Sequence, residues 1–313
     1  MALFDEISRA DRAVLCDSEH RRRRDRGAHP IFQYSALPNG IVKRLHRMTI
    51  LEEVHDYWNR QSCGTGVTDA PKHSRAYFEE IEQYRYAVEP EIFAFAQFTR
   101  HSGQKMLEVG VGAGTDFLQW CRAGTQAHGV DLTEEAIANV QHRLEIFSQR
   151  AVELKVANAE KLPYPDNNFD LVYSWGVIHH SPDTEKCFAE IARVVRKDGT
   201  VKLMLYHRHS LVAFYLWVRY GLLRGRLWRS LSDVVYHHME SIGTKSYTRS
   251  EVHDMARRHG LAVRNIDVTA SPTYDLLGQY PWPLRAGAYV LASLAGFSRC
   301  GWYMRIEMTK GCG

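Results

Sequence analysis

The sequence predicts an α/β fold with a doubly wound, seven-stranded, mostly parallel sheet, N-terminal helices and helical cap insertions. Three observations indicate this fold. Short apolar runs alternate with helical patterns from Lys105 onward. The first run, residues 106–109, ends in alternating glycines just where a helical pattern begins. The next run, residues 127–130, ends in Asp131, and this layout is typical of a nucleotide-type ligand bound at the carboxyl ends of parallel strands.

The chain of 313 residues is long enough for one large domain with elaborations. We expect four parts along it: an N-terminal extension at 1–47, an N-terminal helical lid at 48–100, a Rossmann-like ligand-binding core at 101–210, and cap insertions with the last two strands at 211–313.

Composition narrows the class of protein. The formal net charge is only +4 and both signs are mixed along the chain, so no nucleic-acid partner is expected. The six cysteines are scattered, which argues against a disulfide framework or a metal site and favours a reducing, cytoplasmic location. The start of the chain lacks the pattern of a secretory signal, and no apolar run is long enough to span a bilayer.

The region ahead of the sheet contains a basic run and two helical patterns. The run Arg21–Arg24 is typical of a solvated surface, with anionic lipid or nucleic acid as the alternative partner. Residues 48–59 and 74–86 have apolar groups at helical spacing. In the second pattern, Tyr77 and Tyr84 are candidates for contact with a substrate, while plain helix packing explains them equally well.

The glycine turn carries the binding hypothesis. Gly110, Gly112 and Gly114 allow positive φ angles and bring backbone N–H groups close to a ligand. Asp131 is placed to accept hydrogen bonds from both hydroxyls of a ribose. The GxGxG spacing differs from the GxGxxG fingerprint of dinucleotide-binding proteins, so a nicotinamide-dependent dehydrogenase is the less favoured nucleotide hypothesis.

Further strand patterns complete the sheet. Residues 152–156 and 169–174 predict the third and fourth strands, and residues 201–206 the fifth. Together with the glycine turn and the loops between these strands, residues 100–206 resemble the class I S-adenosylmethionine-dependent methyltransferases. The resemblance is to the branch that includes ubiquinone and menaquinone biosynthesis enzymes and many natural-product methyltransferases.

The resemblance implies S-adenosylmethionine as cofactor, S-adenosylhomocysteine as product and no metal. Glu108 would accept from the ammonium group of the cofactor, and Asp131 from its ribose. The family usually has Asp where this chain has Asn158, whose amide oxygen can still accept a hydrogen bond from adenine. The other residues expected to contact the cofactor are Leu132, Ala159 and Glu160 at the adenine, and Ser174 and Trp175 at the methionine part and the sulfonium.

His179 and His180 follow the fourth strand, where the substrate is expected to enter. A neutral imidazole there can remove a proton as the methyl group is transferred, and His179 is weakly preferred for that role. Capping of the next helix is the alternative role for one of the pair. Positioning alone also accelerates such a displacement, so no strong base is required.

The region after the fifth strand is expected to cover the site. Tyr206, His207 and His209 stand at the carboxyl end of that strand and are candidates for substrate contact, with loop structure as the alternative. Residues 211–229 are apolar over most of a helical circumference, which favours a cap over the site and leaves a membrane interface as the second use. An apolar helix at 286–297 supplies the second cap, between strands expected at 262–268 and 301–307.

The sequence therefore predicts a methyltransferase for a small, partly hydrophobic molecule, with a secondary metabolite or a glycosylated or isoprenoid-like precursor as acceptor and oxygen favoured over carbon or nitrogen. Two alternatives stay open. One is a C- or N-methyltransferase of a prenyl- or lipid-linked acceptor at a membrane surface, and the other is a protein that binds the cofactor without transferring methyl. The extra N-terminal helices also leave a homo-oligomer open.

Overall fold

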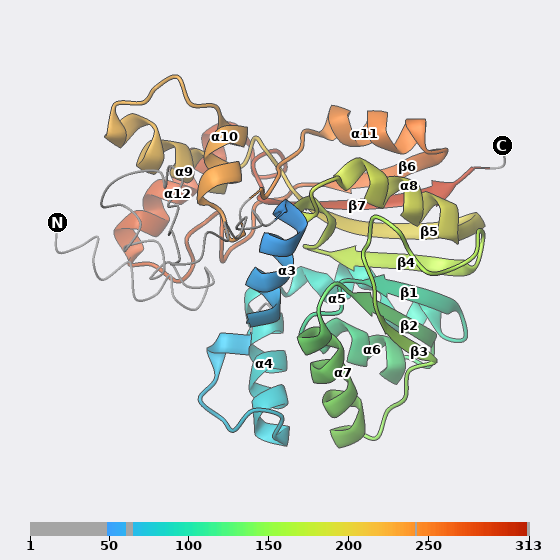
Figure 1. The fold of residues 1–313 in the computed structure, drawn as a ribbon. Coiled ribbons are helices and arrows are strands. Elements are labelled where there is room, and N and C mark those ends of the chain that lie inside the picture. Colours follow the sequence, from blue (N-terminus) through green and yellow to red (C-terminus); the bar gives the residue numbers. More distant parts are fainter. Residues whose placement is uncertain (1–48, 61–64, 242, 312–313) are drawn as a thin grey trace, which may run out of the picture.

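The computed structural model describes residues 49–60, 65–241 and 243–311. Its centre is a seven-stranded sheet with the order β3-β2-β1-β4-β5-β7-β6 (Figure 1). Every neighbouring pair is parallel except the two pairs that β7 makes. The predicted fold class is thereby confirmed. The strands are β1 (Lys105–Val109), β2 (Gln126–Asp131), β3 (Glu153–Val156), β4 (Phe169–Trp175), β5 (Val195–Tyr206), β6 (Leu261–Asp267) and β7 (Tyr303–Lys310).

Two hydrophobic cores cover the two faces of the sheet, as alternation along the strands requires. Leu107 of β1 packs in the core that contains Phe188 of helix α8 (Thr184–Val194) and residues of α11 (Arg249–Arg258). Its neighbour Met106 belongs to the opposite core, with Trp120 of α6 (Thr115–Arg122) and residues of α7 (Glu134–Ile146). Because both faces of the sheet are buried, the residues at the ends of its strands are held in fixed positions.

The two helices expected ahead of the sheet are present as α3 (Ile50–Arg60) and α4 (Arg75–Val88). A third helix, α5 (Glu91–Ala96), and the short 3₁₀ turns η1 (Thr65–Val67) and η2 (Phe98–His101) were not expected. Ser74 is the N-cap of α4, and its hydroxyl accepts from the backbone N–H of Tyr77. The Arg21–Arg24 run and the expected extension at 1–47 lie outside the described residues.

A buried ion pair fixes α4 against the sheet. Nε and Nη2 of Arg85 donate to the two carboxylate oxygens of Asp116 at 2.9 and 2.7 Å. The Asp116 side chain is only 3% exposed and also accepts from the hydroxyl of Tyr173 in β4. A bidentate guanidinium and a phenol thus satisfy one buried carboxylate.

We expect Asp116→Asn to lower the free energy of unfolding by about 3 kcal/mol, because it removes the bidentate one of the two buried carboxylates that pair with Arg85, the other being Glu89 at 3.3 Å. Urea unfolding followed by circular dichroism measures the effect. The control is Asp166→Asn, whose carboxylate pairs with Arg193 but is 69% exposed, and we expect a loss below about 1 kcal/mol there. Equal losses in the two variants would contradict a structural role for the buried pair.

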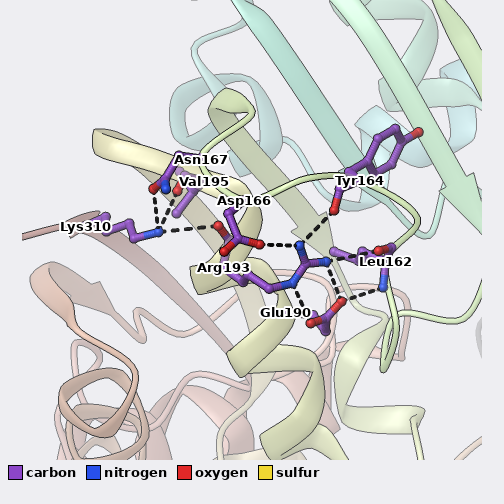
Figure 2. Close-up of polar contacts among 8 residues, drawn as sticks. All are labelled: Leu162, Tyr164, Asp166, Asn167, Glu190, Arg193, Val195 and Lys310. Carbon is purple, nitrogen blue, oxygen red and sulfur yellow. Dashed lines mark hydrogen bonds and ion pairs between the residues drawn. The ribbon is translucent and has the colours of Figure 1, made fainter.

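A second polar cluster holds the loop between β3 and β4 (Figure 2). The guanidinium of Arg193 at the end of α8 donates to the backbone oxygens of Leu162 at 3.0 Å and Tyr164 at 2.7 Å. Lys310 at the end of β7 donates to Asn167 and to the backbone oxygen of Val195, both at 2.9 Å. The cluster therefore fixes a loop that begins at the carboxyl end of β3, beside the expected adenine position.

The cap consists of α9 (Leu211–Tyr220), η4 (Leu222–Arg224), α10 (Leu231–His238) and α12 (Trp282–Ala295). Helices α9, α10 and α12 gather to one side of the sheet (Figure 1). Among the described residues, no helix combines the length and the apolar character needed to cross a membrane.

Three expected boundaries in and near the cap differ from the structure. The apolar segment at 211–229 is broken at Gly221, where a Cβ atom would lie 2.7 Å from the backbone oxygen of Trp217. The second cap helix begins at Trp282 rather than 286, because Pro281 and Pro283 stand at its start, where backbone N–H groups have no partner within the helix. Strand β5 begins at Val195 rather than 201, because Val195 already pairs with Phe169 before a bulge.

Candidate functional site

One cavity of about 1040 Å³ lies at the carboxyl ends of β1, β2, β4 and β5. The wall on the side of the sheet contains the glycine turn, Asp131 and Trp175. The wall on the side of the cap is formed by residues of α9, η4 and α12. The volume is at the upper end of the range of about 300–1,000 Å³ for small-molecule sites. The cavity is therefore large enough for two ligands side by side.

The glycine turn requires glycine for two different reasons. All three glycines have positive φ angles, of 84° at Gly110, 50° at Gly112 and 75° at Gly114. A Cβ atom on Gly110 would lie 2.2 Å from a methyl carbon of Val177, and one on Gly114 would lie 2.9 Å from a methyl carbon of Val140. A Cβ atom on Gly112 would meet no atom within 4 Å. Gly110 and Gly112 line the cavity, whereas Gly114 caps α6 outside its wall.

We expect Gly112→Ala to separate binding from folding. The positive φ angle costs an alanine about 1 kcal/mol of stability, and the new methyl group extends toward the cavity rather than into packed atoms. Ligand affinity at the glycine turn is expected to fall at least about tenfold, which corresponds to about 1.4 kcal/mol. Calorimetric titration and urea unfolding measure the two effects. Unchanged affinity would show that the ligand does not approach this turn.

Asp131 is held at the end of β2 by backbone and hydroxyl donors. Its Oδ2 accepts from the N–H of Gly112 at 3.0 Å, and its Oδ1 accepts from the N–H and hydroxyl of Thr133 at 3.0 and 2.9 Å. Burial raises the pKa of this carboxyl, and the hydrogen bonds from Gly112 and Thr133 oppose that shift. The carboxylate is thus oriented before any ligand arrives.

The residues expected at the adenine are partly brought together. Leu132, Asn158 and Ala159 line the cavity beside Asp131. Glu160 does not line it, because its Oε1 accepts from the hydroxyl of Ser181 at 2.6 Å and from the backbone N–H of Asp183 at 2.9 Å. Glu160 therefore fixes the entry to α8 instead of facing the expected adenine.

Glu108 is a buried acid at the end of β1. Glu108 lines the cavity, and within the described part of the chain its buried Oε2 has no hydrogen-bond partner. Burial raises the pKa of Glu108 well above its ordinary value, and neighbouring Asp116 adds to the shift. A buried carboxyl with an unpaired oxygen favours a ligand that brings a positive charge or a donor.

The charge of the cavity wall discriminates between nucleotide-type ligands. Two basic side chains line it, Arg85 and Arg219. Five acidic side chains do so: Glu89, Glu108, Asp116, Asp131 and Glu240. This excess of carboxyl groups favours a ligand that brings a positive charge or hydrogen-bond donors over one that brings a diphosphate. In residues 49–60, 65–241 and 243–311, no three His, Cys, Asp or Glu side chains are grouped so as to hold a metal ion.

The comparisons with known proteins agree with this geometry. Residues 107–203 match the family model described as a methyltransferase domain. This part of the chain is a class I, S-adenosylmethionine-dependent methyltransferase domain. Within that class, the domain is of the type that includes the ubiquinone and menaquinone biosynthesis enzymes.

Two curated relatives align with about a third of the chain. Phosphoethanolamine N-methyltransferase 2 of Caenorhabditis elegans is 35% identical over 105 residues, which are 33% of this chain and 24% of that protein. The 27-O-demethylrifamycin SV methyltransferase of Amycolatopsis mediterranei is 29% identical over 104 residues, 33% of this chain and 38% of that protein. The chain thus spans well under two thirds of the length of these relatives.

A solved structure extends the similarity of fold beyond that domain. The geranyl diphosphate C-methyltransferase of Streptomyces coelicolor superposes with a TM-score of 0.54 at 15% identity. The superposition covers 84% of this chain and 98% of that one. At this identity the comparison supports the fold, including segments outside the methyltransferase domain.

A second polar group faces the part of the cavity under the cap. The hydroxyl of Tyr206 donates to Oε2 of Glu240 at 3.0 Å, and Nε2 of His180 lies 3.4 Å from the same oxygen. On its other side, Nδ1 of His180 lies 2.9 Å from the hydroxyl oxygen of Ser241 and 3.0 Å from that of Thr244. We call His180, Tyr206 and Glu240 the cap-side triad.

Burial tunes the two titratable partners of the cap-side triad in opposite directions. It lowers the pKa of His180 to about 3, with Lys245 adding to the shift. It raises the pKa of Glu240 to about 7, while the hydrogen bond from Tyr206 opposes that rise. Near neutral pH the imidazole is therefore uncharged, and the carboxyl group is the member poised to exchange a proton.

The other histidine of the pair lies elsewhere. His179 is fully buried and does not line the cavity, and burial lowers its pKa well below the ordinary value. The geometry therefore moves the preference from His179 to His180. Neither histidine caps the next helix, because the side chain of Asp183 accepts from the N–H of Lys186 at the start of α8.

Several expected contact residues support the site from outside the cavity. Ser174 donates to the backbone oxygen of Val109 at 2.8 Å and so ties β4 to β1. Tyr77 packs with Phe78 and Ile81 in a separate buried cluster. Nδ1 of His207 lies 3.1 Å from the backbone oxygen of Gly301. His207 and His209 line a different pocket. Trp175, Tyr84 and Tyr206 do line the cavity.

Other polar residues of the wall were not predicted from the sequence. Oε1 of Glu89 accepts from the hydroxyls of Tyr274 at 3.2 Å and Tyr303 at 2.8 Å. Glu89 follows α4, Tyr274 lies between β6 and α12, and Tyr303 begins β7. No motif links residues so far apart in sequence. For Glu240, its place in an aromatic and histidine-rich run was the only signal.

Proposed function

We propose that the chain transfers a methyl group from S-adenosylmethionine to a small, partly hydrophobic acceptor by direct in-line displacement. The observation that carries the proposal is that one cavity joins the glycine turn, Glu108 and Asp131 to an apolar wall under the cap. The methyltransferase domain supplies the part of that cavity that contains the glycine turn, Glu108 and Asp131. Segments outside the domain supply the apolar wall under the cap.

The residues present fit the cofactor. Asp131 would accept from the ribose hydroxyls, and the unpaired oxygen of Glu108 would accept from the ammonium group. Leu132, Asn158 and Ala159 would border the adenine. The ring of Trp175 would lie near the sulfonium, where an aromatic face attracts a cation. The open space beside Gly112 would admit the ligand to the backbone N–H groups.

The acceptor would occupy the cap side of the cavity, beyond Trp175. That wall contains apolar side chains that include Leu216, Leu284 and Leu291, which favours a lipophilic molecule. When bound, S-adenosylmethionine supplies the methyl group: the acceptor–carbon bond forms, the carbon–sulfur bond breaks, and its electron pair stays on sulfur. Glu240 would receive the proton of an acceptor hydroxyl, while His180 and Tyr206 orient the carboxylate.

An oxygen acceptor is favoured because the cap-side triad offers a proton acceptor at the position where the nucleophile would lie. Carbon or nitrogen methylation of a prenyl- or lipid-linked molecule is the second candidate, and the exposed apolar surface of the cap favours it. The ¹³C chemical shift of the methyl group in products made with ¹³C-methyl-labelled cofactor distinguishes the atoms methylated.

Calorimetric titration of the full chain with S-adenosylmethionine tests the proposal. We expect micromolar binding, followed by transfer of labelled methyl to hydroxylated lipophilic acceptors. Binding without transfer to any acceptor class would support a cofactor-binding protein that is not an enzyme. Absence of binding, with and without candidate acceptors present, would overturn the proposal.

A further inference from the structure

The cap concentrates the exposed apolar side chains of the molecule. Of the 16 large apolar side chains that are exposed among the described residues, 12 belong to residues 214–228 and 282–297. Trp228 is 79% exposed, Trp282 77% and Leu294 81%. Single exposed apolar residues are ordinary on protein surfaces, but such a concentration marks a surface that contacts an apolar partner. We call these 12 residues the cap apolar surface.

The two segments that bear the cap apolar surface carry charge of one sign. Residues 199–232 and 276–306 contain no aspartate or glutamate. Arginines are interleaved with the apolar residues, and the exposed ones are Arg219, Arg224, Arg226, Arg285 and Arg299. Tryptophan and leucine beside arginine without acids is the composition of segments that lie at the interface of an anionic bilayer.

The cap apolar surface is continuous with the cavity. Phe214, Leu223, Leu284 and Leu291 are exposed and also line the cavity. The cavity therefore opens among the same side chains that form the surface. A lipophilic molecule can pass along them from an apolar phase into the site without crossing water.

We propose that the cap apolar surface docks on an anionic lipid bilayer and that the acceptor enters the cavity from that bilayer. The second half of this statement rests on the proposed methyl transfer, whereas docking does not. A second copy of the chain is a poorer occupant. A two-fold interface would bring the arginines of both copies together, and residues 199–232 and 276–306 contain no acid to pair with them.

Sedimentation of the full chain with vesicles tests docking. One set of vesicles is phosphatidylcholine alone, and the other is an equimolar mixture with phosphatidylglycerol. We expect binding to the mixed vesicles that weakens as salt is raised, because salt screens the attraction between the arginines and the anionic lipids. Arg224→Gln with Arg226→Gln is expected to remove most of the preference for the mixed vesicles.

Substitution of the apolar anchors gives the sharper result. Trp228→Glu combined with Leu294→Glu is expected to lower the partition to mixed vesicles at least about tenfold, since two apolar anchors are removed and two negative charges are introduced. Neither residue lines the cavity. The matched control is Val152→Glu, at a 61% exposed apolar position just ahead of β3, and we expect it to bind like the parent protein.

Two results would overturn docking: no sedimentation with mixed vesicles, or sedimentation that Trp228→Glu with Leu294→Glu leaves unchanged. A dimer in ultracentrifugation that this double variant dissociates would assign the surface to a second copy instead. Calorimetry with S-adenosylmethionine on the same proteins separates the two proposals. Vesicle binding without cofactor binding would leave docking standing and overturn the methyl transfer.

Discussion

Replacement of Glu240 by glutamine is expected to lower kcat by about 10²- to 10⁴-fold, the range for loss of a positioned proton acceptor. Glutamine keeps the shape of the side chain and an acceptor for the hydroxyl of Tyr206, so the cap-side triad stays in place. It cannot take a proton from the acceptor. Affinity for S-adenosylmethionine is expected to remain unchanged, because the proposed cofactor contacts lie at Glu108 and Asp131.

The dependence of the methyl-transfer rate on pH tests the role of Glu240 independently. Glu240 must be ionised to receive a proton, and burial raises its pKa to about 7. The rate is therefore expected to rise with pH and to level off above about pH 7. His180, with a pKa lowered to about 3, stays neutral over this range. The Glu240→Gln variant is expected to lose the rise.

Glu145→Gln, at a side chain that is 77% exposed, is the matched control and is expected to keep the parent rate. If Glu240→Gln retains the parent kcat and pH profile, proton removal at Glu240 is contradicted, and positioning alone accounts for the rate. A variant that fails only through misfolding is recognised by urea unfolding.

The parts of the site that could be predicted from sequence are those that local chemistry determines. Gly110 and Gly112 follow β1 directly, and their positive φ angles are a property of the turn itself. Asp131 follows β2 in the same way. Because carboxyl ends of parallel strands meet at one edge of the sheet, a few contiguous residues were enough to place this half of the site.

On the cap side, sequence analysis named His180 and Tyr206 but not Glu240 or the contact among the three, because these residues meet only through long-range packing. Tyr77 and Tyr84 share one face of α4, yet only the later turns of the helix reach the cavity, so Tyr84 lines it and Tyr77 does not. His179 and His180 are neighbours in a 3₁₀ turn. The direction of that turn decides which ring faces the site, and sequence spacing contains no such information.

The affinity for S-adenosylmethionine is expected to fall at least about 10²-fold in Asp131→Ala. Each hydrogen bond to a charged acceptor is worth about 1.5–3 kcal/mol, and the proposed pose gives the carboxylate two ribose hydroxyls. Calorimetric titration measures the loss. Asp254→Ala, at a 51% exposed side chain on α11, is the matched control and is expected to bind like the parent protein.

Asp131→Asn refines the test, because Asp131 also has a structural role. Its oxygens accept from the N–H groups of Gly112 and Thr133, so alanine removes partners of the turn as well as of the ligand. Asparagine keeps one acceptor oxygen and the side-chain shape. We expect it to restore most of the stability but only part of the affinity, since an amide is the weaker acceptor for two hydroxyls. A folded Asp131→Ala variant with unchanged affinity would place the cofactor outside this cavity and contradict the proposed site.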